Sequence, residues 1–391
     1  GTPQLVSAPT VPAEKRTDNG GDVVWNGANW VAVYNQWARP WAWDSPRGGC
    51  DDVFARLLDP DGTPAAGAVN INDDGSTTAT NALWWNMWPV AIWTGANVVA
   101  FYEDARHDRS RDYVMGHLLT ATGGRIGNDV RLDDNGTRVT QKFPAAAWTG
   151  TEIGVAWQDD RDGGFEIYFR RFDSSLLPIG GSVRVTNAIG TSRVPAVAWS
   201  GSEYGIVWED NRDGGDHEIY FARVSATGEK IGSDVRLTSF PGQSLDPEIT
   251  WSGSHYGVSW HDDGWGNMEI GFMTLDAAGT IVTGPVRVTS DSHVSAESDI
   301  VWNGSAFAIV WRDRRTGDGD VYLSVVAPDG TEIVDDERIT DTPGASLQPA
   351  IAWNGSSYGI LWKDKPNPAP AASRTVNAWN LETMFVTVSC P

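Results

Sequence analysis

Acidic residues recur at one position of this chain and are the first candidates for chemistry. An aspartate stands two residues after a tryptophan or tyrosine, and an arginine often follows, as in Asp159 and Arg161. Such a carboxylate most simply caps a turn and pairs with the arginine. The alternative is a ring of carboxylates that binds Ca²⁺ through oxygen ligands. The candidate metal ligands are Asp104, Asp159, Asp210, Asp262, Asp313, His261 and His293.

Tryptophan is the second unusual feature, with 21 residues, eight of them outside the repeated positions described below. Six of the eight fall in two segments near the start, 35–52 and 72–88. Clustered indoles in loops either stack on a ligand or form a small separate hydrophobic cluster that packs the loops against the scaffold. Both interpretations stay open. The candidate ligand-binding residues are Trp37, Trp41, Trp43, Trp84, Trp85, Trp88, Arg39 and Trp265.

Acid–base catalysis by histidine is a further possibility. His261, Trp265 and His293 would lie on one rim of the molecule, where a histidine beside an arginine or tyrosine can serve a lyase-type reaction. The chain has no GxSxG motif, no phosphate-binding glycine loop and no Cys/His pair with metal spacing. The sequence therefore assigns no catalytic residue.

The elements that position these residues are short strands arranged in a repeat. A Trp-Xaa-Gly triplet occurs seven times, and from Trp148 onward it recurs every 51 or 52 residues. Within one copy, four runs rich in Val, Ile, Tyr, Phe and Trp alternate with Gly, Asp, Asn and Ser, which is typical of strands and turns. Periods of this size indicate propellers or solenoids.

We therefore predict an all-β fold, a single domain over residues 1–391. It would be a seven-bladed β-propeller of four-stranded antiparallel blades, in which the repeated tryptophans pack between blades. We expect the ring to be closed by exchange of a strand between the two chain ends. The only two cysteines, Cys50 and Cys390, are expected to form a disulfide beside this closure, which implies an oxidising compartment.

The connections after the second strands carry a family resemblance. WQDDRDGGFEIY at Trp157, WEDNRDGGDHEIY at Trp208 and WRDRRTGDGDVY at Trp311 are each close to W-x-D-x-R-x-G-x-x-[DE]-[IV]-Y. This string resembles the repeats of TolB-like propellers and of many bacterial and archaeal surface proteins. The resemblance implies a propeller fold and export, but such propellers bind proteins, bind glycans or act as enzymes.

Composition limits the partners. The formal net charge of −22 disfavours nucleic acid and anionic lipid, which are bound through clustered Lys and Arg. We expect a monomer that is secreted, periplasmic or at the cell surface, without membrane insertion. Its expected function is to bind a glycan or other extracellular ligand through the Trp-rich rim. The alternatives are a polysaccharide lyase or hydrolase, and a structural protein with a bound metal ion.

Overall fold

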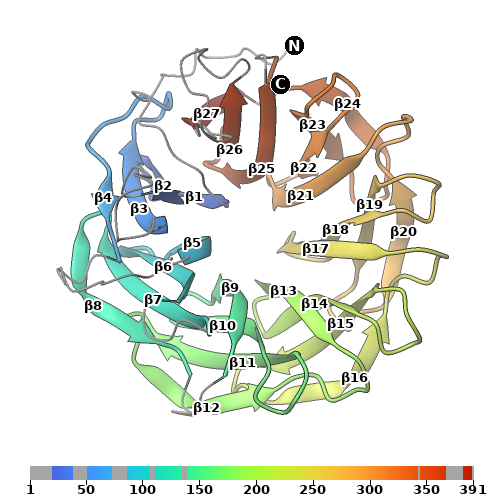
Figure 1. The fold of residues 1–391 in the computed structure, drawn as a ribbon, viewed down its shortest axis with the longest axis horizontal. Coiled ribbons are helices and arrows are strands. Elements are labelled where there is room, and N and C mark those ends of the chain that lie inside the picture. Colours follow the sequence, from blue (N-terminus) through green and yellow to red (C-terminus); the bar gives the residue numbers. More distant parts are fainter. Residues whose placement is uncertain are drawn as a thin grey trace, which may run out of the picture.

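The structure is a computed structural model that describes residues 20–37, 51–72, 86–105, 111–133, 139–341, 344–366 and 382–389. These residues form 27 strands, which assemble into separate antiparallel sheets around a common axis (Figure 1). The chain is therefore a β-propeller, as the repeats predict. No helix in the described part of the chain is long and apolar enough to cross a membrane.

Six sheets have four strands each, which follow one another in sequence order from the axis outward (Figure 1). The first two sheets are β1 (Gly21–Trp25), β2 (Trp30–Trp37), β3 (Asp51–Leu58) and β4 (Val69–Asn70), then β5 (Asn86–Trp93), β6 (Asn97–Asp104), β7 (Tyr113–Thr120) and β8 (Arg125–Arg131). The next two are β9 (Gln141–Trp148), β10 (Glu152–Asp159), β11 (Glu166–Asp173) and β12 (Pro178–Arg184), then β13 (Ser192–Trp199), β14 (Glu203–Asp210), β15 (Glu218–Ser225) and β16 (Lys230–Arg236). The last two are β17 (Ser244–Trp251), β18 (Tyr256–Asp262), β19 (Glu269–Leu275) and β20 (Ile281–Arg287), then β21 (Ser295–Trp302), β22 (Phe307–Asp313), β23 (Asp320–Val326) and β24 (Glu332–Arg338).

The remaining sheet has only three strands, β25 (Gly344–Trp353), β26 (Ser357–Pro366) and β27 (Glu382–Ser389). The prediction of seven four-stranded blades is therefore wrong: six sheets are blades of that kind. No fourth strand joins β27 in the described residues, because the described chain ends with that strand and no N-terminal strand pairs with it.

The predicted ring closure by strand exchange and a disulfide is not observed in the described residues. Both Cys50 and Cys390 lie outside those residues. Side-chain packing joins the ends of the ring instead. Val23 and Trp30 of the first blade share a buried cluster with Ala350 and Leu361 of the three-stranded sheet.

The Trp-Xaa-Gly triplet forms the turn between the first and second strands of each sheet. In the fourth blade, Ser200 Oγ accepts a hydrogen bond from the Glu203 backbone N–H and donates one to the Glu203 carbonyl. Gly201 has a φ of 94°, which glycine adopts without the steric penalty of a side chain. The triplet is thus a turn signal as well as a packing signal.

The core lies between neighbouring sheets. Trp208 is fully buried in a cluster that joins the third and fourth blades, and Trp157, Trp260 and Trp311 are equally buried, so the predicted packing role of these tryptophans is confirmed. A glycine makes room for an aromatic ring of the next blade at three of these interfaces. A Cβ on Gly154 would lie 2.3 Å from the Tyr204 ring of the next blade, closer than van der Waals contact permits.

Candidate functional site

The repeated aspartates are held by the scaffold. Asp159 is fully buried, and its Oδ2 accepts hydrogen bonds from Trp157 Nε1 at 3.0 Å and Arg161 Nη2 at 2.6 Å. Burial alone would raise the pKa of Asp159, but bonds from Arg161, Gln141 and Trp157 hold it below its usual value. These contacts tie the end of the second strand to the following loop.

The same arrangement recurs in other blades. The indole Nε1 of Trp208, Trp260 and Trp311 donates to the aspartate two residues later, at distances of 2.9 to 3.1 Å. The other predicted metal ligands are Asp104, which is buried, and His293, which is exposed and pairs with Asp291. Among the described residues, no group of three His, Cys, Asp or Glu side chains is placed to hold a metal ion.

The predicted tryptophan surface lies only partly within the described residues. Arg39, Trp41, Trp43, Trp84 and Trp85 lie outside them, and Trp37 is the last residue of β2. Trp265 packs on Phe240 and Trp260, with ring centroids 5.7 and 6.4 Å apart. Trp88 lies in β5 and belongs to a site that the sequence did not lead us to predict.

A ring of residues with left-handed backbone conformation marks this site. Eight described non-glycine residues have a positive φ, and six of them occupy the same position of the repeat, near the start of the innermost strand. Each lies at a register shift between the first and second strands, which is a β-bulge. We call these six residues and Gly20 of the first blade the channel ring. The six are Trp88, Phe143, Val194, Asp246, Glu297 and Gln348.

Proline explains part of this local structure. It follows five of the six residues, as in Trp88-Pro89 and Asp246-Pro247. Proline has no N–H to donate to the strand ladder, so it fits best where a bulge interrupts the pairing. A left-handed residue of this kind is strained, and strain of this kind concentrates at functional sites.

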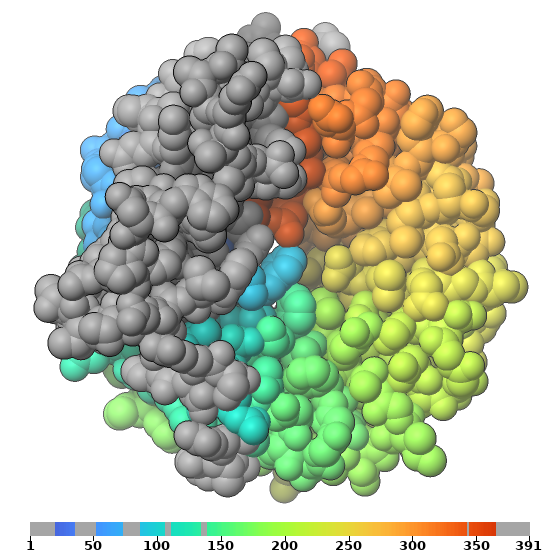
Figure 2. All heavy atoms as spheres, viewed as in Figure 1, coloured from blue at the N-terminus to red at the C-terminus, as the bar shows by residue number. Residues whose placement is uncertain are grey.

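The channel ring opens onto a cavity along the axis of the propeller. The innermost strands β1, β5, β9, β13, β17, β21 and β25 surround it (Figure 1), and its volume is about 410 Å³. In the space-filling view, the surface is hollowed at the centre of the ring (Figure 2). Cavities that hold small ligands are of this size.

The channel has two chemically different walls. Strands β5, β9 and β13 contribute only apolar side chains, and the rings of Trp88 and Phe143 lie 5.2 Å apart at an angle of 41°. The adjacent strands β17 and β21 contribute four carboxylates, and β1 adds a fifth. The acidic lining residues are Asp22, Asp246, Glu248, Glu297 and Asp299.

Four carboxyl groups of the acidic wall, those of Asp22, Asp246, Glu248 and Asp299, have raised pKa values. Asp22, Glu248 and Asp299 keep partial access to the channel but are otherwise enclosed by protein. Burial raises the pKa of Asp299 to about 7 and that of Asp22 to about 6, against the hydrogen bonds that each accepts from backbone N–H groups. For Glu248, burial and the negative charge of Asp299 raise the pKa well above its usual range.

A second ring of polar side chains, the interblade ring, supports the first. It consists of the residue that follows the Trp or Tyr near the end of each second strand: Asn35, Glu103, Gln158, Glu209, His261, Arg312 and Lys363. In the second blade, Glu103 Oε1 accepts the backbone N–H of Phe143 in the next blade at 2.8 Å. Gln158 does the same for Val194 at 3.0 Å. Burial raises the pKa of Glu103 to about 8.

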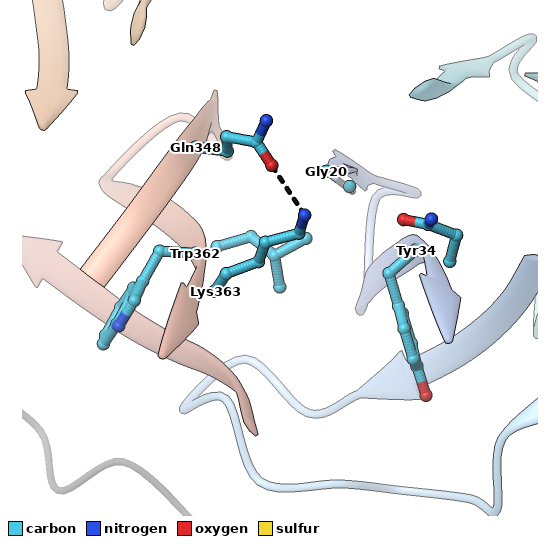
Figure 3. A pocket seen from close by; sticks show the side chains of 8 residues that line it. Gly20, Tyr34, Gln348, Trp362 and Lys363 are labelled. Atoms are coloured by element: carbon cyan, nitrogen blue, oxygen red, sulfur yellow. Dashed lines mark hydrogen bonds between the residues drawn. The ribbon is translucent and has the colours of Figure 1, made fainter. Parts of the chain in front are cut away.

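Two cations of the interblade ring bind the channel ring directly. Arg312 Nη1 donates to Glu297 Oε1, and Lys363 Nζ donates to Gln348 Oε1 (Figure 3), each at 2.6 Å. The Lys363 contact borders a small cavity of about 10 Å³ between the first blade and the three-stranded sheet. That space holds about one water molecule, so the axial channel is the candidate binding site.

His261 differs from the rest of the interblade ring. Its side chain is 7% exposed, yet Nδ1 has no hydrogen-bond partner among the described residues. Burial lowers its pKa, against the attraction of Asp246 and Glu297, so the imidazole is held towards its neutral form. The sequence analysis singled out His261 as a metal ligand but did not place it beside channel carboxylates.

The sequence did contain a signal for both rings. In a repeat protein, positions that are identical in every copy serve the scaffold, whereas positions that differ between copies are free to serve a ligand. The residue before proline in the first strand changes from Trp88 to Val194 to Asp246, and the middle residue of W-x-D changes from Gln158 to His261 to Lys363. The aspartate on which the metal prediction rested is the same in six of the seven copies.

The fold and the channel together define the class of protein: a β-propeller with an axial cavity that is apolar on one side and acidic on the other. No family model matches the chain, and no curated protein matches it.

Solved structures resemble it over most of its length. A puromycin-hydrolyzing peptidase of Mycobacterium tuberculosis has a TM-score of 0.54 at 11% identity, over 92% of this chain and 52% of that one. Trypanosoma rangeli sialidase in complex with sialic acid has a TM-score of 0.51 at 10% identity, over 86% and 56%. This chain spans about half the length of these proteins, and at such identity the likeness shows the fold alone.

Proposed function

We propose that this protein binds a glycan in the axial channel, between the aromatic side chains of β5 and β9 and the carboxylates of β17 and β21. The observation that carries the proposal is the division of the channel into these two walls. A sugar ring has the same division, because its C–H groups form an apolar face and its hydroxyls project around the edge.

The aromatic wall provides the stacking surface. Trp88 and Phe143 are partly exposed and lie in contact with each other in strands of neighbouring blades. A rigid aromatic surface that is already in place loses little entropy when a ligand stacks on it. We also propose that Trp41, Trp43, Trp84 and Trp85, which lie outside the described residues, contribute to glycan binding.

The acidic wall provides hydrogen-bond acceptors for hydroxyl groups. A buried carboxylate gains most from a ligand that donates to it, because its oxygens have already lost most of their contact with bulk water. Polar groups of this kind select ligands by orientation, since an analogue without the hydroxyl leaves a buried acceptor unpaired.

Glycan cleavage is the second candidate function. Asp299, with its pKa of about 7, is partly protonated near neutral pH, and burial also raises the pKa of Glu248. A protonated carboxyl is the group that donates to a leaving oxygen in glycoside hydrolysis. A lyase or hydrolase on this scaffold would use these residues. Release of reducing ends from a bound polysaccharide would distinguish cleavage from binding.

The remaining expectations are part of the same proposal. The W-x-D-x-R repeat supports a place among TolB-like propellers, and with it export to the periplasm, the cell surface or the medium. We propose that the protein acts there as a monomer on an extracellular glycan, without nucleic acid or membrane partners.

A pair of matched variants tests the binding site. A glycan array first identifies a ligand, and calorimetry then compares Trp88→Gly with Val194→Gly. Both residues occupy the channel ring with φ near 50°, so glycine relieves the same backbone strain in each, as Gly20 does in the first blade. Trp88→Gly should abolish binding, and Val194→Gly should leave it within about twofold. Equal affinities for the two variants would refute the proposal.

A further inference from the structure

We infer that the glycan carries a primary ammonium group, as an amino sugar does, and that the ammonium binds to the fifth blade beside Asp246, Glu248 and His261. The inference rests on the proposed function and names the class of sugar.

The charge of the channel is the first observation. Among its described lining residues there are five carboxylates and no lysine or arginine. Glu297 is neutralised by Arg312 at 2.6 Å, and Asp22 and Asp299 each accept two backbone N–H groups. Asp246 and Glu248 have no hydrogen bond to their carboxylates from any described residue. The channel carboxyl groups without a hydrogen bond are therefore concentrated on β17, where Asp246 is also attracted by Arg193.

His261 is the second, independent observation. It is in β18, whose neighbour β17 carries both carboxylates, and it interacts electrostatically with Asp246. A buried ring nitrogen without a partner is destabilising, and such an atom calls for an explanation such as a ligand that completes its hydrogen bonds. A neutral imidazole can accept a hydrogen bond from an N–H donor.

An ammonium fits this environment better than the other candidates. It carries a positive charge and three donors, which match the two carboxylates of β17. The imidazole of His261 lies beside Asp246, behind the channel lining. A bare metal ion fits less well, because no three such side chains in the described residues are placed to coordinate one. A hydroxyl group supplies one donor and leaves the charge of β17 uncompensated. Trp88 and Phe143 across the channel add the stacking surface for the sugar ring.

Calorimetry with four probes tests the inference on the full chain. The probes are a chitosan hexasaccharide, its fully N-acetylated form, cellohexaose and spermidine. We expect the chitosan oligomer to bind at least about tenfold more tightly than the two neutral oligosaccharides, as for a hydrogen bond to a charged group. Equal binding of the neutral oligosaccharides overturns the inference but leaves the proposed function standing. Equal binding of spermidine overturns the claim that the ligand is a sugar, and the absence of binding by all four probes overturns both.

Isosteric variants locate the ammonium. Asp246→Asn and Glu248→Gln should each weaken chitosan binding by about tenfold to a hundredfold, and should weaken cellohexaose binding less. Asp335→Asn is the matched control, because it removes the same charge from an exposed position in the outer strand β24. The melting temperature of each variant, measured beside its affinity, distinguishes lost binding from unfolding. Wild-type affinity in both β17 variants would refute the assignment.

Discussion

Raising the pH should destabilise the folded protein because of the channel carboxylates. Burial raises the pKa of Asp299 from 3.8 to about 7, that of Asp22 from 3.8 to about 6 and that of Glu103 from 4.5 to about 8. Each group binds its proton more tightly in the folded state than in the unfolded chain. Its contribution to stability is therefore complete below pH about 4 and is lost as the pH rises through the folded-state value.

The magnitude follows from the size of the shifts. One pKa unit corresponds to about 1.4 kcal/mol, so the shift of about 3 units at Asp299 alone amounts to about 4 kcal/mol between pH 4 and 8. His261 acts in the opposite direction, because its lowered pKa favours folding as the pH rises through its unfolded-state value of 6.5. It is one group against several carboxylates, so the net effect is a loss of stability.

Urea unfolding at several pH values from about 5 to 8 measures this effect. The free energy of unfolding should fall by several kcal/mol over the range, and Glu248→Gln should reduce the fall because it removes one of the titrating groups. Asp335→Asn, at the exposed outer strand, should leave the fall unchanged. A free energy of unfolding that is constant or rises with pH would show that these carboxylates are not desolvated.

The scaffold makes two further predictions. Gly154→Ala should destabilise the protein by about 1 to 3 kcal/mol, because the added Cβ meets the Tyr204 ring, whereas Gly67→Ala, with open space around it, should have no effect in urea unfolding. Arg161→Ala should lower the free energy of unfolding by about 3 kcal/mol, because it leaves the buried Asp159 carboxylate without its cation. If thermal and urea unfolding place Arg161→Ala within about 0.5 kcal/mol of the wild type, the repeated Asp-Arg pair does not stabilise the blades.

The scaffold could be predicted from sequence because its positions repeat. Trp157, Trp208 and Trp260 occur in one environment several times over, so their common pattern specified strands, turns and packing together. The three-stranded sheet could not be predicted in this way, because the repeat pattern predicts four strands for every copy. No fourth strand pairs with β27 in the described residues. The place of a strand within its blade, rather than its residue types, decides whether it surrounds the axis.

The channel was harder to predict because its residues have nothing in common as a type. Trp88, Val194 and Asp246 share a left-handed bulge and a proline that follows, but their side chains are of different types. The tryptophan-rich segments were predicted to bind the ligand because their tryptophans fall outside the repeated positions. Of that set, Trp88 is the residue that the structure places in the channel lining.

A crystal structure of the protein with the chitosan hexasaccharide tests the central claim most directly. We predict density for a sugar ring in the axial channel, stacked on Trp88 or Phe143, with its amino nitrogen within hydrogen-bond distance of Asp246 or Glu248. A ligand bound on the outer strands, with the channel holding only water, would contradict both the proposed function and the site assigned to it.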